Sequence, residues 1–172
     1  MPDLTGWLVR RRVALGFACG GVGLWLAQPT WTTWAAGCGV AALGETTRVW
    51  AAGHLDKNRE VTSSGPYRMT AHPLYLGSTI MGVGFAIAAW HAVVAVMLGV
   101  YLAATLSAAI RREERFLRTR FGDGYERYRH GRSATSRRAF SLSRAWGNRE
   151  YRAVVGFAAI ASILAVKAAL RA

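Results

Sequence analysis

The sequence is poor in acidic residues and in cysteine. Asp and Glu together number 9 against 22 Lys and Arg in 172 residues, for a formal net charge of +13. The two cysteines, Cys19 and Cys38, lie in apolar runs without a C-x-x-C pattern or a Cys/His cluster. This argues against a disulfide scaffold and against a metal site, and both side chains are expected to be buried thiols.

The sequence also lacks the low hydrophobicity that, together with a high net charge, is typical of a disordered chain. Hydrophobic residues make up 52% of the sequence. The length suits one domain over residues 1–172, and no internal repeat is evident. The charged and the apolar residues must therefore occupy separate segments.

Four long stretches are almost free of ionisable side chains, and a fifth carries a single Lys near its end. A membrane-spanning helix needs about 20 mainly apolar residues, with a lower limit of about 17. The pattern predicts an all-α integral membrane helical bundle of about five transmembrane helices. The second is long enough only if Glu45 and Arg48 face protein or water. The predicted spans are residues 12–28, 31–50, 74–90, 92–110 and 151–170.

Lys and Arg fall before the first span and in the loops 48–68 and 111–152, whereas the turns around Pro29 and His91 contain none. By the positive-inside rule, we expect the long loops in the cytoplasm. The Ala- and Arg-rich composition indicates a high-GC bacterium, and the inner membrane is the expected location. Contact with membrane lipids explains the arginines, so neither nucleic acid nor an obligate protein partner is predicted. The alternative for residues 10–28 is a cleaved signal peptide, which the Gly-rich helix and the lack of a cleavage site disfavour.

A polar loop leads into the third predicted span and carries the first candidate site. Residues 64–66 (Ser-Gly-Pro) are a turn signal, and Pro73 suits the first turn of a helix. His72 then precedes a helix N-terminus, whose free N–H groups attract a carboxylate or phosphate. His72 and Tyr75 are three residues apart and share a helix face. Alternatively, Tyr75 is an interfacial aromatic and His72 only a cap.

Two adjacent carboxylates, Glu113 and Glu114, follow the fourth predicted span. They repel each other at a membrane boundary, so arginines or a cationic ligand must compensate. On a helix they point about 100° apart, so only one is expected to face the bundle. The alternative is a solvated, salt-bridged helix exit.

Together the two segments resemble the isoprenylcysteine carboxyl methyltransferase family and its phospholipid methyltransferase relatives, which are integral membrane enzymes that use S-adenosylmethionine. The family pattern is S-G-x-Y, H-P-x-Y-x-G, a hydrophobic hairpin, E-E and F-G-x-x-Y-x-x-Y. This chain matches it at residues 64–67, 72–77, 113–114 and 121–128.

The resemblance implies a cytoplasmic pocket for S-adenosylmethionine, formed by the third and fourth spans and the loops 54–73 and 111–130. It implies that Glu113, rather than Glu114, faces the cofactor. Aromatic rings attract a sulfonium, and a carboxylate accepts hydrogen bonds from hydroxyl and ammonium groups. The implied cofactor-binding residues are Glu60, Val61, Thr62, Tyr67, His72, Pro73, Leu74, Tyr75, Gly77, Glu113 and Glu114.

Two departures from the family pattern concern the methyl acceptor. Ala71 replaces the arginine usual before the His-Pro pair, and Ala109 replaces an arginine that holds the substrate carboxylate in isoprenylcysteine enzymes. Arg68, Arg111 and Arg112 are the candidate catalytic substitutes. The expected acceptor is lipophilic, either an isoprenylcysteine-like carboxylate or a lipid headgroup.

Two other function classes stay open on the sequence. One is a membrane reductase with a nicotinamide cofactor, because sterol-reductase-like membrane proteins resemble this family distantly at the cofactor end. The other is a non-catalytic membrane protein. The basic loop 130–149 is expected to be an amphipathic connector on anionic lipid or, alternatively, a lid.

Overall fold

The computed structural model describes residues 4–56, 62–123, 125 and 138–171. Every element in these ranges is helical, which confirms the predicted all-α fold. The elements are α1 (Leu4–Leu26), α2 (Trp31–His54), the short 3₁₀ helix η1 (Gly65–Arg68), α3 (Pro73–Ala89), α4 (Ala92–Phe121), α6 (Leu142–Gly147) and α7 (Tyr151–Ala169).

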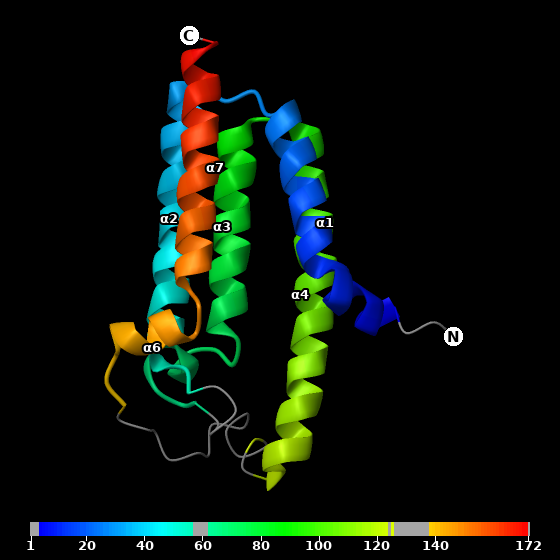
Figure 1. Ribbon diagram of the computed structural model, residues 1–172, viewed down its shortest axis with the longest axis vertical. Coiled ribbons are helices and arrows are strands. Elements are labelled where there is room, and N and C mark those ends of the chain that lie inside the picture. The colour runs from blue at the N-terminus through cyan, green and yellow to red at the C-terminus, as the bar shows by residue number, and fades with distance from the viewer. Residues whose placement is uncertain (1–3, 57–61, 124, 126–137, 172) are drawn as a thin grey trace.

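The long helices run roughly along one axis (Figure 1). Helices α2, α3 and α7 pack together, and α4 packs against both α1 and α3. The short elements η1 and α6 lie where α2 ends and α3 begins, and both contact α2. We call this the site end of the bundle. The turns from α1 to α2 and from α3 to α4 lie at the opposite end (Figure 1).

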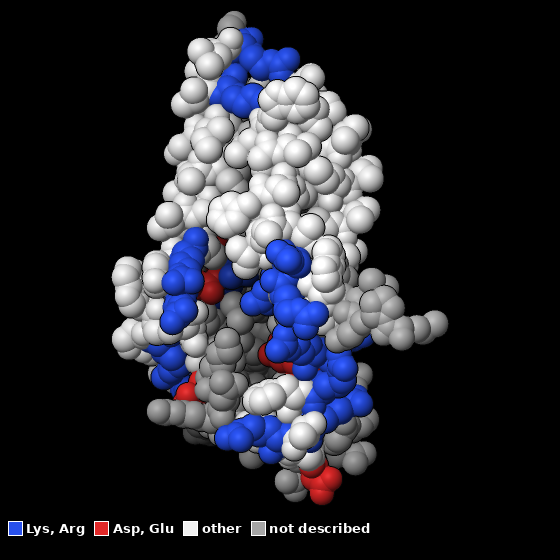
Figure 2. Space-filling view, turned by 45° about the vertical axis from the view of Figure 1, so that its right-hand side comes forward, with Lys and Arg blue, Asp and Glu red and all other residues white. Residues whose placement is uncertain are grey.

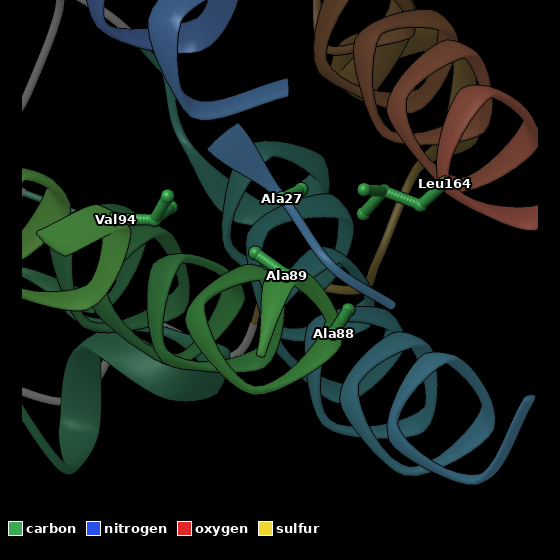
Figure 3. Close-up of a cluster of buried hydrophobic side chains, with 5 residues drawn as sticks. All are labelled: Ala27, Ala88, Ala89, Val94 and Leu164. Atoms are coloured by element: carbon green, nitrogen blue, oxygen red, sulfur yellow. The ribbon is translucent and has the colours of Figure 1, made fainter. Parts of the chain in front are cut away.

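A small apolar cluster joins the helices at that opposite end. The amide of Gln28 donates a hydrogen bond to the carbonyl of Ala89 at 2.7 Å, which ties the two turns together. Most of the buried side chains in the cluster are alanines, so neighbouring backbones approach closely. The cluster consists of Ala27, Ala88, Ala89, Val94 and Leu164 (Figure 3).

Glycines determine the spacing between α2 and α3. Gly37 faces Gly84, and a Cβ at either position would overlap backbone atoms of the other helix. Nearer the site end, a Cβ on Gly44 would lie 2.6 Å from the carbonyl oxygen of Gly77. Small residues permit such close contact between membrane helices. The structure therefore places Gly77 against α2.

Two of the described helices, α4 and α7, are long and apolar enough to cross a membrane. Helix α3 is apolar but has only 17 residues. The predicted five spans are thus corrected to two candidates. The main reason in α1 is that Arg10–Arg12 lie inside the helix rather than before it. In α2, Glu45 and Arg48 lie among glycines and threonines that lower its hydropathy.

Candidate functional site

The start of α3 forms one wall of the candidate site. His72 is the N-cap of α3, and Pro73 is buried in the first turn, where its missing N–H leaves no hydrogen bond unmade. The rings of His72 and Tyr75 are 5.7 Å apart between centroids. The two side chains therefore share a face, as their spacing predicts.

The far part of α4 forms the facing wall, because α4 continues beyond its apolar stretch as one helix. Oε1 of Glu114 lies 3.4 Å from Nε2 of His72. The hydroxyl of Tyr75 is within hydrogen-bonding reach of Glu113. Both glutamates therefore approach residues at the start of α3, and both are half-buried, which does not fit the expectation that only one of them faces the bundle.

A groove of about 550 Å³ opens between α3 and α4 beside these side chains. Its polar end is formed by Thr70, His72 and Tyr75, and the rest of its wall is mainly aliphatic. Ligand pockets commonly combine an apolar lining with a few polar groups that orient the ligand. This groove has the shape and lining for a lipophilic molecule whose polar group lies near His72. The aliphatic and small residues of the wall include Leu76, Val83, Leu98, Leu102, Leu106 and Ile110.

The other described residues that were predicted to bind the cofactor are not among the lining residues of this groove. Thr62 and Tyr67 are buried, and the hydroxyl of Thr62 accepts a hydrogen bond from the amide of Asp56 at 3.3 Å. Leu74 is half-buried in the first turn of α3. Glu60 and Val61 lie outside the described residues.

The candidate catalytic arginines are on the surface. Arg68, Arg111 and Arg112 are all exposed, whereas Ala109 is buried. Lys and Arg gather over the site end, whereas the surface above them is mostly uncharged up to a small basic patch at the other end (Figure 2). None of these three arginines is among the lining residues of the groove.

A buried ion network joins α2, α3 and the start of α7, and the sequence did not reveal it. Nη2 of Arg48 lies 2.7 Å from Oε1 of Glu150 at the start of α7, and Nε of Arg48 lies 3.7 Å from Oε2 of Glu45. Nη1 of Arg48 donates a hydrogen bond to Ser78 of α3. The spacing of Glu45 and Arg48 was a visible signal for a pair, but no local pattern connects them to Glu150.

Residues 138–148, which include α6, form a segment that we call the strap. The strap docks on the end of α2: the side-chain amide of Asn148 donates hydrogen bonds to the carbonyls of Ala52 and Leu55, each at 2.9 Å. Nη1 of Arg138 lies 3.0 Å from Oδ2 of Asp56. This part of the predicted loop 130–149 is therefore held against protein, and residues 130–137 lie outside the described ranges.

Comparison with known proteins gives two matches. A family model described as phospholipid methyltransferase matches residues 12–124, which include α2, α3 and both glutamates. The chain is also similar to the cobalt-zinc-cadmium resistance protein CzcN of Cupriavidus metallidurans, with 31% identity over 101 residues. That match covers 58% of this chain and 45% of CzcN. No solved structure matches the chain.

Proposed function

This chain belongs to the phospholipid methyltransferase family, and from that premise we propose that it is an integral membrane enzyme that moves a methyl group from S-adenosylmethionine to a lipophilic acceptor. One observation carries the proposal: His72 and Tyr75, which interact with Glu114 and Glu113, lie at the polar end of an apolar groove. A polar methyl donor and a lipophilic methyl acceptor require a site with one polar end and one apolar end.

The residues at the polar end suit the chemistry of the donor. The positive end of the α3 dipole favours a carboxylate near the start of the helix, and Glu113 and Glu114 are acceptors for hydroxyl and ammonium groups. The ring of Tyr75 offers a face to a sulfonium. We propose that Tyr67 and Thr62, which are buried in the segment between α2 and α3, complete the donor site.

In methyl transfer, a lone pair of the acceptor forms the new bond to the methyl carbon while the carbon–sulfur bond breaks and its electron pair stays on sulfur. The three atoms must lie in line, so the main tasks of the protein are positioning and the exclusion of water. The walls of α3 and α4 do both, because they confine the acceptor laterally and are largely apolar. We propose that the basic site end faces the bacterial cytoplasm.

The groove also bears on the acceptor. Among the described residues that line the groove there is no Lys or Arg. Ala109, which replaces the arginine that holds the substrate carboxylate in isoprenylcysteine enzymes, is buried. A carboxylate that entered such a groove unpaired would lose its hydration at a large cost. We therefore propose a small lipid or an amine-bearing headgroup as acceptor, with Arg68, Arg111 or Arg112 contacting any phosphate at the rim.

S-adenosylmethionine and its demethylated product are expected to raise the melting temperature of the purified protein, and NADPH is not. A ligand that binds only the folded state adds about 2.7 kcal/mol of stability at 100 times its Kd. Thermal unfolding in detergent measures this effect. Stabilisation by NADPH alone would favour a reductase, and stabilisation by none of the three would favour a non-catalytic protein.

The rate of methyl transfer to a lipid extract is expected to rise with pH through the pKa of the acceptor amine, because an amine must lose its proton before it attacks. A carboxylate acceptor is already ionised near neutrality and gives a flat profile. Transfer of an isotope-labelled methyl group, measured with a lipid extract and with a farnesylcysteine analogue, distinguishes the two. Efficient, pH-independent methylation of the analogue alone would reject the amine acceptor while leaving the methyltransferase intact.

A further inference from the structure

His54 is the last residue of α2, and only 6% of its surface is exposed. Its Nδ1 lies 3.1 Å from the hydroxyl oxygen of Ser64, which precedes η1. The backbone of Arg138, in the strap, lies within hydrogen-bonding reach of the same ring, and the ring of Phe140, also in the strap, is 6.3 Å away between centroids. One imidazole therefore connects the strap to the turn that leads into η1.

The turn itself is shaped around this ring. Gly65 has a φ of 55°, in the left-handed region that favours glycine, and a Cβ there would lie 2.5 Å from Cδ2 of His54. Ser64 is 1% exposed, and its hydroxyl bonds to His54 instead of capping η1. The ring thus determines where η1 begins, and η1 carries the buried Tyr67.

The surroundings of the ring favour its neutral form. Burial, together with the guanidinium groups of Arg144 and Arg138, lowers the pKa of His54 below its usual range. The carboxylate of Asp56 is paired with Arg138, and the other rings around His54 are the uncharged Trp50 and Phe140. A neutral imidazole has one donor and one acceptor nitrogen, which matches its two hydrogen-bond partners.

We propose that His54 is a positioning residue for donor binding, which acts as a neutral hydrogen-bond bridge between the strap and the Ser64–Gly65 turn and so holds Tyr67 in place. This inference rests on the proposed function, because it takes Tyr67 to be part of the donor site. His54 acts through the turn.

The first test compares donor affinities. His54→Ala and Ser64→Ala are each expected to raise the Kd for S-adenosylmethionine roughly tenfold, equivalent to about 1.4 kcal/mol, and to leave the acceptor KM unchanged. The double variant should lose little more than either single one, because both changes remove the same hydrogen bond. His54→Asn, which keeps a polar atom near the position of Nδ1, should recover most of the affinity.

The matched control is His91→Ala. His91 is a half-buried N-cap at the opposite end of the bundle, and its replacement should leave the donor Kd at the wild-type value. An equal loss of affinity in this control would mean that the effect is general destabilisation and would overturn the inference.

A residue with a purely structural role would not alter how donor binding depends on pH. This pH dependence therefore tests the proposed role of His54. Protonation places a third positive charge beside Arg144 and Arg138, so wild-type affinity should fall as the pH falls through the pKa of His54. The fall is absent above that pKa, where the ring is already neutral. The His54→Asn variant has no titrating ring and should lack this dependence; an identical profile in both proteins would contradict the bridge.

Limited proteolysis tests the bridge independently of the donor. Arg68 ends η1 and is exposed, so trypsin should cleave after it faster in His54→Ala than in the wild type or in His91→Ala. Unchanged cleavage would overturn the inference. A wild-type protein that binds no S-adenosylmethionine would instead overturn the proposed function, and cleavage after Arg68 would still decide whether His54 orders the turn.

Discussion

Replacing Glu113 by Gln is expected to weaken binding of S-adenosylmethionine roughly tenfold to a hundredfold, far more than the same change at Glu114. Loss of a hydrogen bond to a charged group costs about 1.5–3 kcal/mol, and each 1.4 kcal/mol is about tenfold in affinity. We propose that Glu113 binds the donor, and in the structure its carboxylate interacts with the hydroxyl of Tyr75. Replacing Glu113 should therefore weaken its interactions with both the donor and the side chain of Tyr75.

Glu114→Gln is the matched control, because Glu114 is adjacent, chemically identical and also half-buried. Its carboxylate faces His72 at 3.4 Å, and a glutamine there keeps an oxygen that can accept a hydrogen bond from that ring. Calorimetric titration of both variants with the donor measures the difference. Equal losses would show that the two carboxylates bind the donor as a pair and would contradict the separate role of Glu113.

The second large effect concerns stability. Gly37→Ala is expected to lower the free energy of unfolding by about 1–3 kcal/mol, the usual cost of overpacking a tight interface. The added Cβ would overlap the backbone nitrogen of Ala88 and the carbonyl oxygen of Gly84. Backbone atoms of a packed helix cannot rotate away as a side chain would, so α2 and α3 must separate. Because α3 carries His72 and Tyr75, donor affinity should fall as well.

Gly39→Ala is the control for this change. Gly39 lies on the same helix, two residues further on, with no heavy atom of a neighbouring element within 4 Å of an added Cβ. The alanine gains up to about 1 kcal/mol of helix propensity, as it does at Gly37, so this variant should be neutral or more stable. Thermal unfolding of both variants in detergent gives the comparison. A loss at Gly39 as large as that at Gly37 would contradict the close packing of α2 on α3.

Helical structure could be predicted from the sequence because it depends on local patterns. A long apolar run satisfies all of its backbone hydrogen bonds in lipid when it forms a helix, and Pro73 suits the first turn of a helix. The proximity of the rings of His72 and Tyr75 agrees with their spacing of three residues, although His72 is the N-cap and lies just outside α3. The predicted number of membrane-spanning helices was less accurate, because the position of Arg10–Arg12 inside α1 depends on where that helix begins.

The sequence by itself therefore determined the helices, the start of α3 and the match to the family. Only the tertiary structure decided which helix faces meet: Gly77 packs on α2, Glu113 and Glu114 both reach α3, and Glu150 closes a network with α2. Residue spacing sets directions around a single helix axis. The rotation and crossing of two helices depend on side chains that are far apart in the sequence, so such contacts appear only when the whole bundle is packed.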